Sequence, residues 1–144
     1  MESLIIRNTQ SPGDYIVLSA ALRDIHKAHP GRFRFGIDVP ERSIFLGNPY
    51  VDLGLRAGAR KIVAKYPLIK SSNQNRFHFL WGFIQFLNEQ LKTSAVLTEL
   101  RPDLHLTDEE KANPPLGATK PYWVVVSGGK RDFTAKWWLP NYWQ

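Results

Sequence analysis

With 144 residues the chain has the length of one ordinary domain, which is enough to bury a hydrophobic core. It contains no cysteine, which excludes a disulfide framework and a thiolate metal site, and no apolar run approaches the roughly 18 residues of a membrane span. The net charge of +6 indicates an anionic partner, namely nucleic acid, anionic lipid or a phosphorylated small molecule. Because Met1–Ser3 lack the basic and apolar regions of a signal peptide, we expect a cytoplasmic protein.

The first thirty residues predict one strand, a turn and a helix. Leu4–Arg7 is a short apolar run typical of a strand, and the turn formers Asn8–Gly13 follow it. Asp14 then opens an apolar-rich helical stretch, Tyr15–Ala28, which ends before Pro30. This order is that of the first βα unit of a doubly wound sheet, in which ligands bind beyond the carboxyl ends of the strands.

Two further strands are predicted after this helix. Residues 33–39 alternate between apolar and polar side chains and predict a second strand, parallel to the first because a helix separates them. Glu41–Gly47 predicts a short helix, and Lys61–Tyr66 predicts a third strand that ends at Pro67.

The densest basic stretch of the chain begins just before the third strand. It contains Arg56, Arg60, Lys61, Lys65 and Lys70, with no acidic residue between them. A solvated face is the simpler interpretation of such a cluster. No zinc-finger spacing, RNP-like strand or GXXG loop accompanies it, so nucleic acid is the less favoured partner.

Phe77–Lys92 is the clearest helix after the first. Its apolar residues recur every three or four positions, which indicates a helix face buried in the core. Leu104–Leu106 predicts a short strand. Thr107–Glu110 has the Thr-x-x-Glu spacing of a capping box and predicts the start of another short helix.

The last part of the chain predicts a linker and the start of a second domain. Residues 113–121 contain three prolines and a glycine, which suits a linker. Residues 122–126 predict a buried strand, which a glycine-rich and basic loop follows. We therefore expect an α/β domain over residues 1–112, with a Rossmann-like, three-layer arrangement and a mostly parallel sheet. Residues 122–144 would be the first strand and loop of a truncated second domain, because one strand cannot bury its own faces.

Asp14 is the first candidate for chemistry. At the start of a helix it accepts backbone N–H bonds as a capping residue, or it acts as a general base towards a bound ligand. Gly13 beside it lets a ligand approach the backbone. The two roles conflict, because N–H bonds and the helix dipole lower the basicity of the carboxylate, but a weak base suffices when the proton leaves late.

The loop Ser127–Lys136 is the second candidate. Gly128 and Gly129 expose backbone N–H groups, and the basic side chains suit a phosphate or diphosphate. The loop matches neither a Walker loop nor a Gly-x-Gly-x-x-Gly fingerprint, and a solvated turn is the competing interpretation. The histidines have no metal-binding spacing, so we assign no metal site.

Together these segments resemble the ADP-heptose:lipopolysaccharide heptosyltransferase family of glycosyltransferases. The match runs in order along almost the whole chain and covers the opening βα unit, an Asn-Pro-aromatic-x-Asp segment, the end of the first domain and the start of the second. The residues that carry it are Leu4–Arg7, Gly13–Asp14, Ser19–Leu22, Asn48–Asp52, Leu104–Leu106, Val124–Gly129 and Lys136–Pro140.

The resemblance implies a GT-B fold of two Rossmann-like domains and an inverting sugar transfer without a metal or other cofactor. The first domain would hold a saccharide or glycolipid acceptor, and the second a nucleotide sugar with heptose as one candidate. Asp14 corresponds to the catalytic base, Lys136 to the lysine that contacts donor phosphate, and Ser127, Gly128 and Gly129 to the same donor site. The enzyme would act in lipopolysaccharide biosynthesis in the cytoplasm, in peripheral contact with an anionic membrane surface. We expect this truncated chain to be inactive alone.

Two other functions fit the residues. One is a non-catalytic module that holds an anionic saccharide or lipid headgroup in the same cleft. The other is a basic nucleic-acid-binding protein, for which affinity would fall steeply with salt. Sugar transfer or donor hydrolysis separates the enzyme from both.

Overall fold

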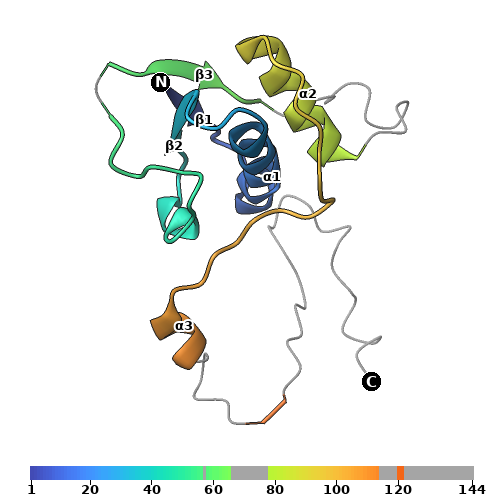
Figure 1. Cartoon of the computed structure of the whole chain (residues 1–144). Helices are drawn as coiled ribbons and strands as arrows, with labels where there is room; N and C mark the ends of the chain where they lie inside the picture. Colours follow the sequence, from blue (N-terminus) through green and yellow to red (C-terminus); the bar gives the residue numbers. More distant parts are fainter. Residues whose placement is uncertain (57, 66–77, 114–119, 122–144) are drawn as a thin grey trace. The chain divides into compact units, whose positions relative to one another are not determined.

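The computed structural model of the chain describes residues 1–56, 58–65, 78–113 and 120–121 (Figure 1). It divides into two compact units, Met1–Glu109 and Glu110–Gln144. Most of the predicted linker and all of residues 122–144 lie outside the described residues, so the predicted domain boundaries stay predictions. Among the described residues, no helix has the length and apolarity needed to cross a membrane.

The first unit contains a three-stranded sheet in which all strands are parallel. β1 (Glu2–Arg7) lies in the centre, with β2 (Phe33–Asp38) on one side and β3 (Arg60–Val63) on the other. Leu4 pairs with Phe35 of β2 and with Arg60 of β3. The α/β class, the parallel sheet and the three predicted strands are therefore confirmed, with each strand shifted by one to three residues at its ends.

α1 (Pro12–Ala28) follows β1 and begins earlier than the sequence predicted. Ser11 is its N-cap residue, with extended backbone, and Pro12 occupies the first helical position. Proline suits this position because its fixed φ is already helical and its missing N–H has no partner there in any helix. Gly13 consequently belongs to the first turn of the helix rather than to the turn before it, and Asp14 lies in that first turn as predicted.

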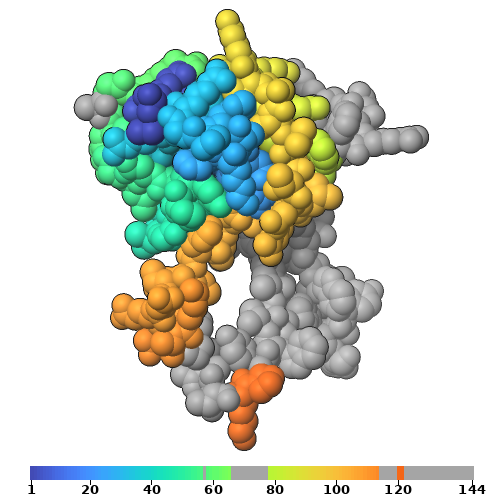
Figure 2. All heavy atoms as spheres, in the orientation of Figure 1, coloured from blue at the N-terminus to red at the C-terminus, as the bar shows by residue number. Residues whose placement is uncertain are grey.

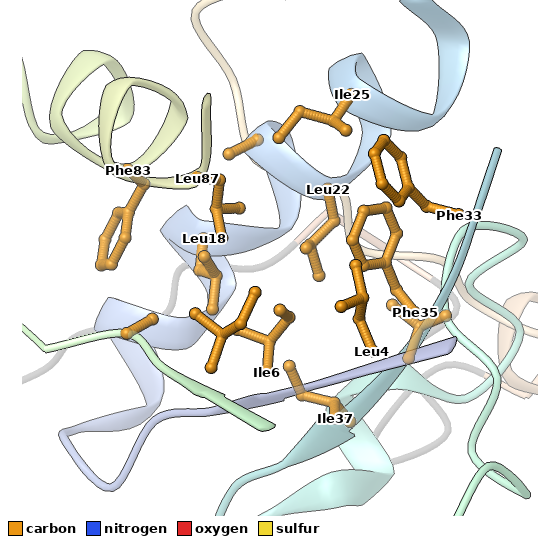
Figure 3. Packing of buried hydrophobic residues seen from close by; sticks show 14 of the residues in the cluster. Leu4, Ile6, Leu18, Leu22, Ile25, Phe33, Phe35, Ile37, Phe83 and Leu87 are labelled. Atoms are coloured by element: carbon orange, nitrogen blue, oxygen red, sulfur yellow. The ribbon is translucent and has the colours of Figure 1, made fainter. Parts of the chain in front are cut away.

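The hydrophobic core lies between α1 and one face of the sheet. Leu4 and Ile6 of β1 are fully buried, and Figure 3 shows them facing Leu18 and Leu22 of α1. The alternating residues of β2 point to the same side, as the pleat of a strand requires; they are Phe33, Phe35 and Ile37.

α2 (Phe79–Leu91) packs against α1 and belongs to the same core. His78 caps it, with its Nδ1 accepting the Leu80 N–H at 3.3 Å. The predicted apolar stripe is confirmed as core, because the repeating residues are buried; they are Leu80, Ile84, Leu87 and Leu91. Trp81, on the other side of the helix, is 36% exposed.

The chain between β2 and β3 passes over the opposite face of the sheet. The connection from β1 to β2 is right-handed and places α1 on one face of the sheet. The connection from β2 to β3 runs in the opposite direction across β1, so the same right-handed rule places it on the other face. This connection starts with η1 (Arg42–Phe45), a 3₁₀ helix where a short helix was predicted. Figures 1 and 2 show its teal and green segments flanking the strands. In the described residues no α-helix covers this face, so the third layer stays a prediction.

The predicted strand at Leu104–Leu106 is wrong. Leu104 and Leu106 are 57% and 50% exposed, and neither belongs to a strand. The preceding backbone bonds to side chains of α1 instead of to a neighbouring strand: the Asp103 N–H donates to Ser19 Oγ at 2.8 Å. The predicted helix that follows is present as α3 (Asp108–Ala112).

Two glycines give a matched test of local packing, Gly36 in β2 and Gly13 in the first turn of α1. A Cβ atom at Gly36 would lie 3.1 Å from Leu55 Cβ and 3.3 Å from Ile5 Cγ1, whereas one at Gly13 would meet nothing within 4 Å. We expect Gly36→Ala to lower the free energy of unfolding by about 1 kcal/mol or more through overpacking. Gly13→Ala should raise it by about 0.4–1 kcal/mol by restricting the unfolded chain. Urea unfolding measures both, and equal effects would contradict the tight contact at Gly36.

Candidate active site

The sheet topology places the start of α1 at a point where α/β proteins bind ligands. The strand order reverses at β1, since the chain passes first to one neighbour and then to the other. In open parallel sheets, ligands bind outside the carboxyl ends of the strands at such a reversal. We call this end, where β1 and β2 finish at Arg7 and Asp38, the carboxyl edge. The first turn of α1 follows directly from it.

Asp14 lies in this first turn with its side chain partly exposed. Its Oδ2 accepts the backbone N–H of Ser11 at 3.0 Å, and the two residues form a capping box. In the described part of the chain Oδ1 has no hydrogen-bond partner. Asp14 therefore caps the helix through one oxygen, and its second oxygen is unbonded among the described residues.

Asn8 shapes the turn between β1 and α1. Its side chain is 1% exposed, its Oδ1 accepts the Gln10 N–H at 2.9 Å, and its own N–H donates to the Asp38 carbonyl at 3.0 Å. The sequence interpretation gave Asn8 no role beyond turn formation. The signal that could have found it is its position directly after a buried strand, where a polar side chain faces the carboxyl edge.

Several enclosed polar atoms near this turn have no partner among the described residues. They are Asn8 Nδ2, Gln10 Oε1 and the Tyr15 hydroxyl. Burying an unpaired polar group costs about 1–3 kcal/mol, so native proteins hold few of them. His29 Nε2, Arg42 Nε and His105 Nε2 also have no partner among the described residues, so such atoms are not confined to this end of the sheet.

A second carboxylate, Asp38, ends β2 at the same edge. Its Oδ2 lies 3.7 Å from Arg7 Nη1 and 4.0 Å from Lys61 Nζ, with all three side chains between 43% and 61% exposed. Ion pairs this exposed contribute little to stability, about 0–1 kcal/mol. Their charges are available to a ligand at the carboxyl edge.

The Asn48–Asp52 segment has a structural role. Asn48 is buried and its Oδ1 accepts the Tyr50 N–H at 2.9 Å, which closes an Asx turn. Asp52 accepts the Gly54 N–H and pairs with Arg34, and these contacts lower the pKa of its carboxyl. In the sheet, Arg34 of β2 lies opposite Ser3, near the start of β1. This motif therefore lies towards the amino end of the strands and away from Asp14.

The predicted site residues are thus only partly placed by the structure. Asp14 and Gly13 share the first turn of α1 at the carboxyl edge, and Gly13 is exposed with open space around it. Ser127, Gly128, Gly129 and Lys136 lie outside the described residues. Within the described ranges, no group of three side chains is arranged to hold a metal ion.

No protein-family model, curated protein or solved structure matches this chain. The fold and the carboxyl edge by themselves define an α/β protein built on a parallel sheet, with its candidate site at the first βα turn.

Proposed function

We propose that the chain is the acceptor-side part of an inverting, metal-independent glycosyltransferase with a GT-B arrangement of two Rossmann-like domains. The observation that carries the proposal is Asp14, a partly exposed carboxylate in the first turn of the helix that follows the central strand, with one oxygen capping the helix and the other unbonded in the described residues. The resemblance of the opening segment to heptosyltransferases supports the same role.

In the proposed reaction Asp14 accepts the proton of an acceptor hydroxyl. The hydroxyl oxygen forms a bond to the anomeric carbon of the donor sugar as the bond from that carbon to the diphosphate breaks, and the diphosphate leaves with the electron pair. A weak carboxylate base suffices for this step, because the hydroxyl becomes acidic only as the new bond forms. Lys136 and the backbone of Ser127, Gly128 and Gly129 would offset the charge on the diphosphate.

A donor screen on the native gene product tests this function. The protein is incubated with nucleotide sugars and saccharide acceptors in the presence of EDTA, and nucleoside diphosphate release is measured with and without acceptor. We expect acceptor-dependent release that EDTA does not abolish. Saccharide binding without release would favour the non-catalytic module, and loss of activity in EDTA would contradict the metal-independent mechanism.

A further inference from the structure

The face of the sheet opposite α1 holds a cavity of about 200 Å³. Its walls come from all three strands and from the connection between β2 and β3. We call it the basic pocket and define it by Ile5, Asp38, Arg42, Leu55, Arg56 and Lys61. It is smaller than the roughly 300–1,000 Å³ of sites that hold drug-sized molecules, so its size suits a small ligand.

The floor of the pocket is apolar and tightly packed. Ile5 is 7% exposed, and Leu55 packs over Gly36 so closely that a Cβ atom there would lie 3.1 Å from Leu55 Cβ. The Asp52 N–H donates to the Phe35 carbonyl at 2.7 Å and ties the connection to the sheet beside this contact. The positively charged side chains therefore surround a fixed surface.

The charges around the pocket are unbalanced. Three cationic side chains, Arg42, Arg56 and Lys61, line it together with one carboxylate, Asp38. Asp38 is itself 3.7 Å from Arg7, a fourth cation just outside the pocket. The cations consequently exceed the carboxylate in number, and a bound anion would relieve their mutual repulsion.

The arginines also have donors to spare. Arg42 donates through Nη2 to the Leu53 carbonyl, which fixes its guanidinium, while its Nε is enclosed and has no hydrogen-bond partner among the described residues. Arg56 makes no ion pair or hydrogen bond in the described residues. A guanidinium group can donate two parallel hydrogen bonds to two oxygens of a phosphate or carboxylate, and a lysine adds a compact positive charge.

We propose that the basic pocket, whose lining does not include Asp14, binds the phosphate of a small phosphate ester. Arg42 and Arg56 donate to the phosphate oxygens, Lys61 supplies charge, and the ester carbon lies against Ile5 and Leu55. The same chemistry is offered by a soluble phosphate monoester and by the headgroup of phosphatidic acid. This binding does not depend on the proposed transferase activity.

Titration of the full chain with glycerol 3-phosphate, followed by NMR or calorimetry, tests the site. We expect saturable, salt-sensitive binding in the millimolar range, since each exposed charge contributes little. The variant Arg56→Gln/Lys61→Gln should weaken binding about ten-fold or more, because both charges contact the ligand. The variant Lys65→Gln/Lys92→Gln removes the same charge outside the pocket and should change the affinity less than about two-fold.

Two outcomes would overturn the proposal, and a vesicle assay identifies the source of its ligand. Equal weakening by the two double variants would mean that net charge alone attracts the anion, and absence of saturation at millimolar concentrations would mean that no site exists. Vesicles with and without phosphatidic acid identify the source: binding that Arg56→Gln/Lys61→Gln abolishes supports a lipid headgroup, and binding of the soluble ester alone supports a free metabolite. Asp14→Asn should leave phosphate binding unchanged, so this test and the transferase test fail separately.

Discussion

Asp14→Asn is expected to lower the turnover of the transferase by about two orders of magnitude or more, the scale on which a positioned general base contributes. Asparagine has nearly the same shape, and its side-chain oxygen can still accept the Ser11 N–H that Asp14 Oδ2 accepts at 3.0 Å. The substitution therefore removes the base and keeps the cap. Measured on the active native protein, the loss should fall on kcat, with the donor KM and the melting temperature little changed.

The control for this prediction is Glu89→Gln. Glu89 is exposed on α2, so the variant removes one negative charge away from the carboxyl edge. Its turnover should equal that of the wild type. Near-normal turnover of Asp14→Asn with an unchanged melting temperature would reduce Asp14 to a capping residue.

Arg23→Met is expected to destabilise the first unit by about 3–5 kcal/mol, the usual effect of removing one member of a buried ion pair. Arg23 is 2% exposed and bonds to Asp24, to Asp103 and to the carbonyls of Glu99 and Arg101 at 2.9–3.1 Å. Methionine fills much of the same volume but leaves these acceptors unpaired. The melting temperature should fall by more than about 12 °C.

Arg101→Met is the matched control, because the Arg101 side chain is 74% exposed and pairs only with Glu99 among the described residues. It should change stability by less than about 0.5 kcal/mol. Where Arg23→Met fails to fold, Arg23→Lys keeps the charge with fewer donors and should have an intermediate stability. A loss below about 1 kcal/mol in Arg23→Met would show that the network contributes little.

Lowering the pH tests the network around Arg23 through its partner Asp24. Burial disfavours the charged form of Asp24, but bonds from Arg23 and Thr98 outweigh it and hold the pKa of this carboxyl below its ordinary value. The unfolded chain therefore takes up the proton first, as the pH falls below about 4. The stabilisation that the ionised Asp24 contributes is complete above that pH. It is lost as the pH falls through the lower pKa that Asp24 has in the folded protein. Asp24→Asn should flatten this acid loss of stability.

Local sequence patterns determined the elements of this fold well. Alternation of apolar residues located β2, three- and four-residue spacing located α2, and the Ser-Pro-Gly-Asp order placed a carboxylate at the start of α1. These signals succeed because the pleat of a strand and the turn of a helix are properties of neighbouring residues. For the same reason Asp14 could be chosen as a candidate without knowledge of its surroundings.

Tertiary structure alone decided which polar residues are buried and which distant ones meet. Arg23 and Asp24 look like the polar side of a helix, yet both are buried because residues 98–103 cross α1 and bond to them. Leu104–Leu106, which follow this crossing, are irregular, although their apolar spacing is that of a short strand. The basic pocket joins Arg42 with Arg56 and Lys61, although the sequence grouped only the last two. Such contacts depend on the crossover that brings β3 beside β1, and no local pattern encodes their partners.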